Sequence, residues 1–162
     1  MTASPSPPRS VEEQTRLDDA LRDLFERLIT FNQVLGLRIE SVNPASVRGR
    51  FDMRPELVGH YLYGRLHGGV ISATLDAMGG LAVTAGIGEK HPGESAEQIM
   101  NRFAKVGTID LRVDFLRPGI GTCFYASATV VRLGGRVGTT QMRLENERGV
   151  LIATGAGAYV IS

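Results

Sequence analysis

The chain of 162 residues is 43% hydrophobic and 22% charged, a composition typical of globular proteins and not of disordered or fibrous ones. This length suits one domain and is too short for two catalytic domains. Because 18 basic residues nearly balance 17 acidic ones, the formal charge of +1 gives no electrostatic reason to expect nucleic acid or a membrane surface as a partner.

The N-terminal segment and the cysteine content bear on location. Residues 1–10 are rich in Pro and Ser and lack the apolar core of a secretory signal, so we expect a disordered tail there. No apolar stretch reaches the roughly 18 uninterrupted residues that a membrane span needs. Cys123 is the only cysteine, which excludes an intrachain disulfide framework and favours a reducing compartment, the cytoplasm.

A helix is predicted directly after the tail. Ser10 followed by Glu13 is the pattern of a capping box, in which each side chain bonds a free backbone N–H at the helix start. Apolar residues then recur at three- and four-residue steps and form one stripe along about five helical turns. The stripe consists of Leu17, Leu21, Leu24, Leu28 and Phe31.

The apolar pattern changes to period two over residues 36–53, which predicts a β-hairpin with its turn at Asn43-Pro44. Residues 55–66 are expected to form a loop. Residues 68–88 are the most apolar segment of the chain, and their Ala, Leu, Met and Ile content over about 20 residues predicts a buried helix.

The C-terminal part is predicted to be mostly strand. A polar stretch and a short helix at residues 96–105 come first, and four strand-like runs follow, near residues 108–116, 122–132, 136–145 and 150–161. Short connections between these runs predict an antiparallel meander. A long apolar helix together with antiparallel strands predicts an α+β fold in which a curved sheet wraps around the helix.

Asp76 is the most informative residue, because it is the one charge in the middle of the apolar helix. A buried carboxylate without a partner costs several kcal/mol, and Asp is a mediocre helix former. Either the side chain lies on a narrow wet stripe or bonds a neighbouring backbone group, or function retains it. The sequence by itself leaves both possibilities open.

The start of the same helix supplies a second chemical group. The first N–H groups of a helix are unsatisfied and partly positive, so the amides at Gly68 and Gly69 can stabilise an oxyanion. Gly68 and Asp76 are eight residues apart, about 12 Å along the axis, which is too far for both to act on one carbonyl. A twofold dimer with antiparallel copies of the helix would bring them together.

Two motifs connect these residues to a known family. His67-Gly68-Gly69, with Asp76 nine positions after His67, resembles the His-Gly-Gly…Asp motif of the phenylacetate-pathway (PaaI-like) hotdog thioesterases and their mammalian counterparts. The run from Thr108 to Pro118 resembles the strand and Arg-Pro turn that follow the helix in that family. The likeness covers residues 35–161. It implies that residues 11–162 form a single hotdog domain with an added N-terminal helix.

The resemblance implies hydrolysis of an acyl-CoA. The Gly68 N–H would polarise the thioester carbonyl, and Asp76 of the facing subunit would act as general base or nucleophile. His67 would shape the site or serve only as a structural helix cap. Thr108 matches a family position whose hydroxyl helps to hold the attacking water, although it could equally be an ordinary strand threonine. No metal or further cofactor is expected, because coenzyme A is part of the substrate.

The chain departs from the family at one position. Many members carry Asn six residues before the His, whereas this chain has Tyr61 there, preceded by His60, so either residue could replace the Asn or line the substrate pocket. A variant of the fold uses Thr four residues after the carboxylate, where this chain has Gly80, and this increases the weight on Thr108. We expect a homodimer, with a tetramer built as a dimer of dimers as the alternative.

Substrate binding gives further expectations. The nucleotide of coenzyme A carries phosphates, so Arg117, Arg132 and Arg136 near the strand turns are candidates to bind it, although solvated strand-end arginines are common. The small residues Gly79, Gly80 and Ala82 would leave room for the acyl chain beside the helix. The segment 89–105 could cover a deeper cavity, which favours medium- or long-chain fatty acyl-CoA over aryl-CoA.

Several other functions are excluded. The chain has no Gly-x-Ser-x-Gly elbow for a serine hydrolase, and its three histidines have no carboxylate at zinc-ligand spacing. Gly155-Ala156-Gly157 is followed by no helix, so it is not a dinucleotide fingerprint. The His and acid motifs of hotdog dehydratases are missing. The alternative kept open is a non-catalytic acyl-CoA-binding or regulatory module, since fold alone does not fix function.

Overall fold

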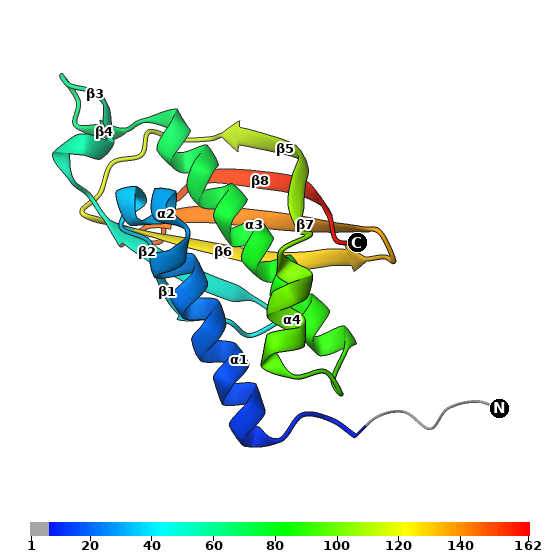
Figure 1. Cartoon of the computed structure of the whole chain (residues 1–162). Coiled ribbons are helices and arrows are strands. Elements are labelled where there is room, and N and C mark those ends of the chain that lie inside the picture. Colours follow the sequence, from blue (N-terminus) through cyan, green and yellow to red (C-terminus); the bar gives the residue numbers. More distant parts are fainter. Residues whose placement is uncertain (1–6) are drawn as a thin grey trace.

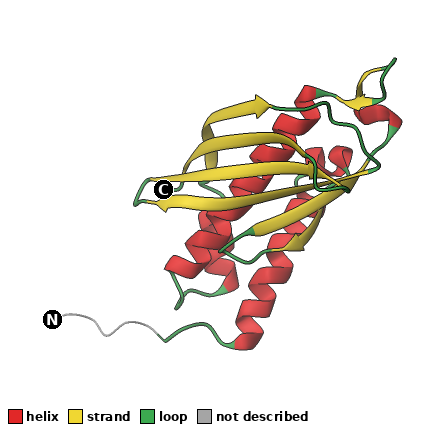
Figure 2. Cartoon of the chain, turned by 180° about the vertical axis from the view of Figure 1, so that it is seen from behind, coloured by secondary structure: helices red, strands yellow, loops and turns green. Residues whose placement is uncertain are grey.

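The computed structural model describes residues 7–162 and consists of a six-stranded sheet with helices on one face (Figures 1 and 2). The long helix α3 (Gly68–Lys90) lies along the sheet. Helices α1 (Val11–Asp23) and α4 (Ala96–Phe103) lie on the same face, where α1 packs against α4 and α4 against α3. The fold is therefore the α+β arrangement of a helix held by a large antiparallel sheet.

The sheet has the order β1-β2-β6-β7-β8-β5, with every neighbouring pair antiparallel. The expected hairpin of β1 and β2 and the four later strands are all present. Their bounds are β1 Arg38–Ser41, β2 Val47–Asp52, β5 Gly107–Phe115, β6 Cys123–Leu133, β7 Val137–Asn146 and β8 Leu151–Val160.

The predicted meander of the last four strands is correct only for β6, β7 and β8. Strand β5 pairs with β8 at the sheet edge, while β6 pairs with β2, so the chain crosses three strand spacings between β5 and β6. Three spacings amount to about 14 Å, which residues 116–122 can span with ease, because seven extended residues reach about 23 Å. A short connection between two strands, such as that between β5 and β6, therefore does not show that they are neighbours in the sheet.

Helix α3 is the core of the fold, but it is not covered on all sides. Its C-terminal half is buried continuously from Leu81 to Gly88. In its N-terminal half, Ala73, Asp76, Ala77 and Gly80 remain half-buried. These four residues follow three- and four-residue steps, so they form one partly open stripe along the helix. By length and composition α3 could cross a membrane, but 67% of its most apolar window is buried inside the fold.

The N-terminal helix begins as predicted and then changes register. The Ser10 hydroxyl accepts a hydrogen bond from the Glu13 N–H, but the Glu13 carboxylate accepts from the Ala96 N–H at 2.8 Å and does not return to Ser10. The predicted capping box is therefore half formed. Of the expected tail, residues 1–6 lie outside the described residues, whereas Arg9 donates to the His91 and Glu94 carbonyls.

A wide turn ends the apolar stripe early. The π-helix η1 (Leu24–Leu28) follows α1, and the Ile29 N–H bonds the Leu24 carbonyl five residues back. The wider turn moves the residues after it off the stripe, so Leu28 at the end of η1 and Phe31 in the following helix α2 (Thr30–Leu35) are 65% and 57% exposed, while Phe25 in η1 is buried. The prediction that Leu28 and Phe31 continue the buried stripe is wrong for this reason.

The segment expected to be a loop before α3 contains a small hairpin. The 3₁₀ turn η2 (Pro55–Leu57) leads into β3 (Val58–His60), which pairs with β4 (Arg65–Leu66). The hairpin projects beyond the main sheet (Figure 1). Its second strand leads directly into α3, and the His67 N–H at the helix start donates to the Leu57 carbonyl of η2.

Candidate active site

Asp76 lies half-buried in the middle of α3, where strand β5 crosses the helix. The Thr108 hydroxyl donates a hydrogen bond to the Asp76 Oδ1 atom at 2.9 Å. The sequence named both residues, and the fold brings them together because β5 begins beside the open stripe of α3. A hydroxyl donor of this kind stabilises the ionised carboxylate without a basic side chain.

A second hydroxyl, from Tyr159 on β8, approaches the same carboxylate. Its oxygen lies 3.2 Å from Asp76 Oδ1 and 3.1 Å from the Asp76 backbone oxygen. Burial, together with the negative charge of Asp76, raises the pKa of Tyr159 well above its ordinary value, so the phenol remains a neutral donor. Sequence reasoning missed Tyr159, and its only trace was Gly79, a poor helix former in the middle of a buried helix.

A cavity of about 260 Å³ opens beside these polar groups. Asp76, Thr108 and Tyr159 form its polar end. The remaining wall is largely apolar and comes from η1, α2, α3, α4 and the start of β5; it includes Phe25, Ile29, Phe31, Ala73, Ala77, Gly80, Phe103 and Val106. The arrangement is thus an apolar chamber that ends at a carboxylate, which suits a ligand with a hydrophobic body and a reactive polar end.

The start of α3 presents a different group. His67 is the N-cap, and its Nδ1 atom accepts a hydrogen bond from the Gly69 N–H at 2.8 Å. Within residues 7–162, the Gly68 N–H has no hydrogen-bond acceptor. The ring of Phe115 lies close by, 3.4 Å from where a Cβ atom of Gly68 would be. Of the amides at Gly68 and Gly69, that of Gly68 is therefore free to bind an oxyanion.

Within one chain the two ends of the candidate site remain apart. Gly68 and Asp76 belong to the same continuous α-helix, and eight residues of helix span about 12 Å. His60 and Tyr61 belong to the β3–β4 hairpin at the Gly68 end and do not line the Asp76 cavity. Tyr61 is 86% exposed, and the His60 ring stacks against the rings of Tyr61 and Tyr63.

The three candidate arginines do not gather in one chain either. Arg132 and Arg136 flank the β6–β7 turn, at the sheet end where Gly107 and Val160 are paired. Arg117 follows β5 at the opposite end, and its guanidinium donates to the Leu151 carbonyl at 3.0 Å. A single protomer therefore has no phosphate site built from all three.

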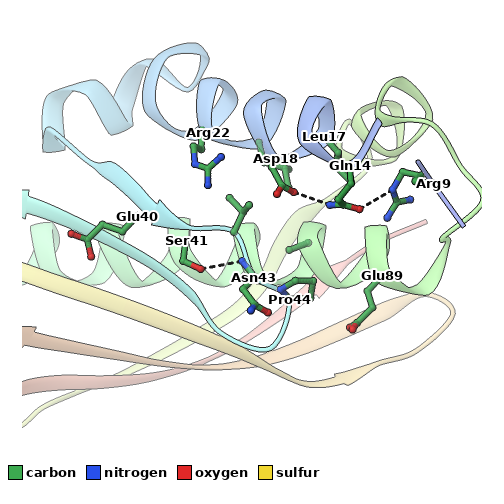
Figure 3. Close-up of a pocket in the computed structure, with 13 residues that line it drawn as sticks. Arg9, Gln14, Leu17, Asp18, Arg22, Glu40, Ser41, Asn43, Pro44 and Glu89 are labelled. Atoms are coloured by element: carbon green, nitrogen blue, oxygen red, sulfur yellow. Dashed lines mark hydrogen bonds between the residues drawn. The ribbon is translucent and has the colours of Figure 1, made fainter. Parts of the chain in front are cut away.

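A larger cavity of about 480 Å³ lies elsewhere, between α1, the β1–β2 turn and the end of α3 (Figure 3). Its side chains bond one another: Gln14 accepts from Arg9 and donates to Asp18. None of the residues predicted from the sequence to form the active site lines it. Within residues 7–162 no cluster of three His, Cys, Asp or Glu side chains could hold a metal ion.

Comparisons with known proteins point to thioesterases. Residues 63–153 match the thioesterase superfamily. The medium/long-chain acyl-CoA thioesterase YigI of Salmonella typhimurium is 35% identical over 139 residues, covering 86% of this chain and 90% of that protein. YigI of Escherichia coli strain K12 is 34% identical over the same coverage. A Shewanella oneidensis protein related to the thioesterase superfamily is 37% identical, with a TM-score of 0.87 over 92% of this chain and 97% of that one.

The sequence motifs, the sheet-and-helix architecture and these matches therefore lead to one family. The resemblance to hotdog thioesterases inferred from His67-Gly68-Gly69 and Asp76 is confirmed, and so is the α+β hotdog fold. This chain belongs to the thioesterase superfamily and is a thioester hydrolase with the hotdog fold.

Proposed function

We propose that this protein is a homodimeric acyl-CoA thioesterase that hydrolyses medium- or long-chain acyl-CoA to the free acid and coenzyme A. The observation that carries the proposal is the position of Asp76 at the polar end of an apolar cavity. The names of the YigI relatives, which describe medium/long-chain acyl-CoA thioesterases, support the same substrate class.

The exposed edge of the sheet supports a dimer. Strand β5 pairs with β8 on one side only. Exposed apolar residues lie near both of its ends: Ile109 near the start is 58% exposed, and Phe115 and Leu116 at and just after the end are 56% and 48% exposed. An edge strand presents unpaired N–H and C=O groups, which are a template for pairing with another chain. Pairing of β5 with β5 of a second copy about a twofold axis would set the two α3 helices antiparallel, with Gly68 of one facing Asp76 of the partner subunit.

The proposed chemistry uses one group from each subunit. The Gly68 N–H donates to the thioester carbonyl oxygen and stabilises the negative charge that develops there. Asp76 of the partner subunit either takes a proton from the attacking water or attacks the carbonyl carbon itself, forming an anhydride that water then opens. In both routes the C–S bond breaks, the thiolate of coenzyme A leaves and takes up a proton, and the carboxylic acid is released. No metal or further cofactor takes part.

The acyl chain would occupy the cavity beside α3. Gly80 and Ala77 keep one wall low, and Phe25 and Phe103 close the far side with their rings 5.7 Å apart. Helix α4, which forms part of this wall, comes from the 89–105 segment that the sequence suggested as a cover. The space beside Gly79 is taken by Tyr159, and Ala82 is fully buried, so neither contributes room for substrate.

The same dimer would gather the groups that one chain keeps apart. Antiparallel pairing of β5 puts Arg117 at the sheet end that carries Arg132 and Arg136 of the partner subunit, where they would meet the phosphates of coenzyme A. His60 and Tyr61 would approach the partner's substrate cavity from the Gly68 end. Cys123 does not line the cavity, and burial raises the pKa of its thiol. We propose the cytoplasm as the site of action, since this lone thiol needs no oxidising compartment.

Replacement of Asp76 tests the proposal. Asp76→Asn keeps the size of the side chain and removes its charge and basicity, so kcat should fall roughly 10² to 10⁴-fold. Release of coenzyme A is followed with a thiol reagent over a series of acyl-CoA lengths, and light scattering checks that the variant remains a dimer.

The matched control is Asp19→Asn on the exposed face of α1, which should leave the rate unchanged. Rates like those of the parent for the Asp76 variant would contradict the assignment. A parent protein that binds acyl-CoA but cleaves none of the series would favour the non-catalytic binding module.

A further inference from the structure

Tyr159 and Thr108 both donate to one oxygen of the Asp76 carboxylate. The distances to Oδ1 are 3.2 Å from the Tyr159 hydroxyl and 2.9 Å from the Thr108 hydroxyl. Among the described residues no donor bonds the other oxygen, Oδ2. The two oxygens of the carboxylate therefore differ: one is held from two strands, and the other remains available at the cavity.

The backbone of α3 is shaped to admit the tyrosine. A Cβ atom at Gly79 would overlap the Tyr159 hydroxyl oxygen and lie 2.7 Å from Cζ, and a Cβ atom at Gly157 would lie 2.9 Å from the same ring. Ala would favour the helix at position 79 more than Gly does. The glycine instead allows a fully buried phenol, 1% exposed, to reach the helix backbone beside Asp76.

We propose that Tyr159 is a positioning residue for the thioesterase reaction: its hydroxyl, together with that of Thr108, fixes the Asp76 carboxylate by Oδ1 and directs Oδ2 at the thioester. The proposal rests on the proposed function. Tyr159 does not touch substrate in this role, since its hydroxyl acts through Asp76. The raised pKa of Tyr159 agrees with the role, because a phenol that stays protonated remains a donor at every pH at which the enzyme works.

The Tyr159 hydroxyl also contacts the backbone of α3. The hydroxyl lies 3.1 Å from the Asp76 backbone oxygen as well, so its single proton is shared between the main chain and the side chain of that residue. A base that is displaced by about 1 Å loses on the order of 10²-fold in rate. Loss of one of two anchors on Oδ1 therefore predicts a defect in the chemical step and not in binding.

The test is Tyr159→Phe, which keeps the ring in place and removes only the hydroxyl. We expect kcat to fall roughly tenfold to 100-fold, while KM for the acyl-CoA and the circular dichroism spectrum stay as in the parent. Tyr125→Phe on β6, which removes a hydroxyl from a tyrosine outside the cavity, is the matched control and should keep the parent kcat. A merely structural role would lower the melting temperature without this separation of kcat from KM.

Gly79→Ala provides a second variant that leaves Tyr159 intact but pushes its hydroxyl away from Asp76. We expect the same loss of kcat. High-resolution crystal structures of the parent and of Tyr159→Phe add a readout that does not depend on turnover: the Asp76 carboxylate should occupy one position in the parent and more than one, or a new one, in the variant.

The outcomes separate the two proposals. If the parent hydrolyses acyl-CoA and Tyr159→Phe has the parent kcat, or if Asp76 keeps its position in the variant crystal, the role of Tyr159 is overturned and the proposed function stands. If the parent cleaves no acyl-CoA, the proposed function fails, and the crystal comparison still decides whether Tyr159 positions Asp76.

Discussion

The carboxylate of Asp76 is stabilised without a cation. Two hydroxyl groups, from Thr108 and Tyr159, bond its Oδ1 atom, and no lysine or arginine bonds it among residues 7–162. A hydrogen bond to a charged group is worth about 1.5 to 3 kcal/mol, so two of them offset much of the cost of moving the carboxylate out of bulk water. Neutral donors keep the charge of the base in place, whereas a bound cation would neutralise it and weaken it as a base or nucleophile.

The contribution of Thr108, one of these two neutral donors, can be tested by itself. Thr108→Val keeps the shape of the side chain and removes its hydroxyl, so the carboxylate loses its shorter hydrogen bond, 2.9 Å in length. We expect kcat to fall roughly tenfold, because a base held by one donor samples more orientations. Steady-state kinetics on one saturating acyl-CoA measures the effect. An unchanged kcat would mean that Thr108 is an ordinary strand threonine.

At the scale of single elements, the sequence predicted those features that depend on local patterns. Periodicity and turn residues predict the apolar run of α3, the β1–β2 hairpin and the bounds of β5 to β8. The apolar surroundings of Asp76 in the sequence show that it is an isolated charge. What it missed depends on contacts between distant segments. Tyr159 lies 83 positions from Asp76 and reaches it only because β8 pairs with β5, which the expected meander did not include.

The π-turn at η1 is a second example of this limit. The wider turn takes Leu28 and Phe31 out of the expected core stripe, and Phe25 and Phe31 instead line the cavity. A helical periodicity argument assumes a constant number of residues per turn, so it fails at such a turn. The consequence concerns function, because the rotated segment forms the wall opposite Gly80.

The wall at Gly80 gives a prediction about chain length. A Cβ atom there would lie 3.9 Å from the Phe25 ring, so Ala fits, whereas the longer side chain of Gly80→Leu fills the cavity. We expect kcat/KM for a long-chain acyl-CoA to fall roughly 10 to 200-fold, with a short-chain acyl-CoA cleaved at the parent rate. The chain-length profile of the variant measures the change.

The control is Glu89→Leu, which adds the same side chain near the end of the same helix, beside the other cavity (Figure 3). It should leave the profile of the parent unchanged. Equal losses for short and long chains in Gly80→Leu would show that the acyl chain lies elsewhere.

At the scale of the whole molecule, the proposed site is incomplete in one chain. The Gly68 amide and Asp76 are held about 12 Å apart by the rigid helix that carries both. No bending of a loop can close this separation, since both groups belong to α3. A second copy is the simplest source of the missing half, and the free edge of β5 is the surface that would receive it.

Ile109 on that edge provides the test of assembly. It is 58% exposed, and Ile109→Lys would replace an apolar side chain of the pairing edge with a charge that loses solvent when the strands pair. We expect a folded monomer by light scattering and circular dichroism, with acyl-CoA hydrolysis reduced at least 100-fold because neither half of the site is complete. Val131→Lys, at a 61% exposed position on β6, should remain dimeric and active. A monomeric Ile109 variant with full activity would disprove the shared site.

Gly79 and Tyr159 also constrain each other in evolution. The phenol occupies the volume that any larger residue at position 79 would need, and a smaller residue at position 159 would leave a hole against the bare helix backbone. A substitution at either position therefore changes the packing at the other. A side chain at position 79 displaces the tyrosine hydroxyl and removes one of the two anchors of the Asp76 carboxylate.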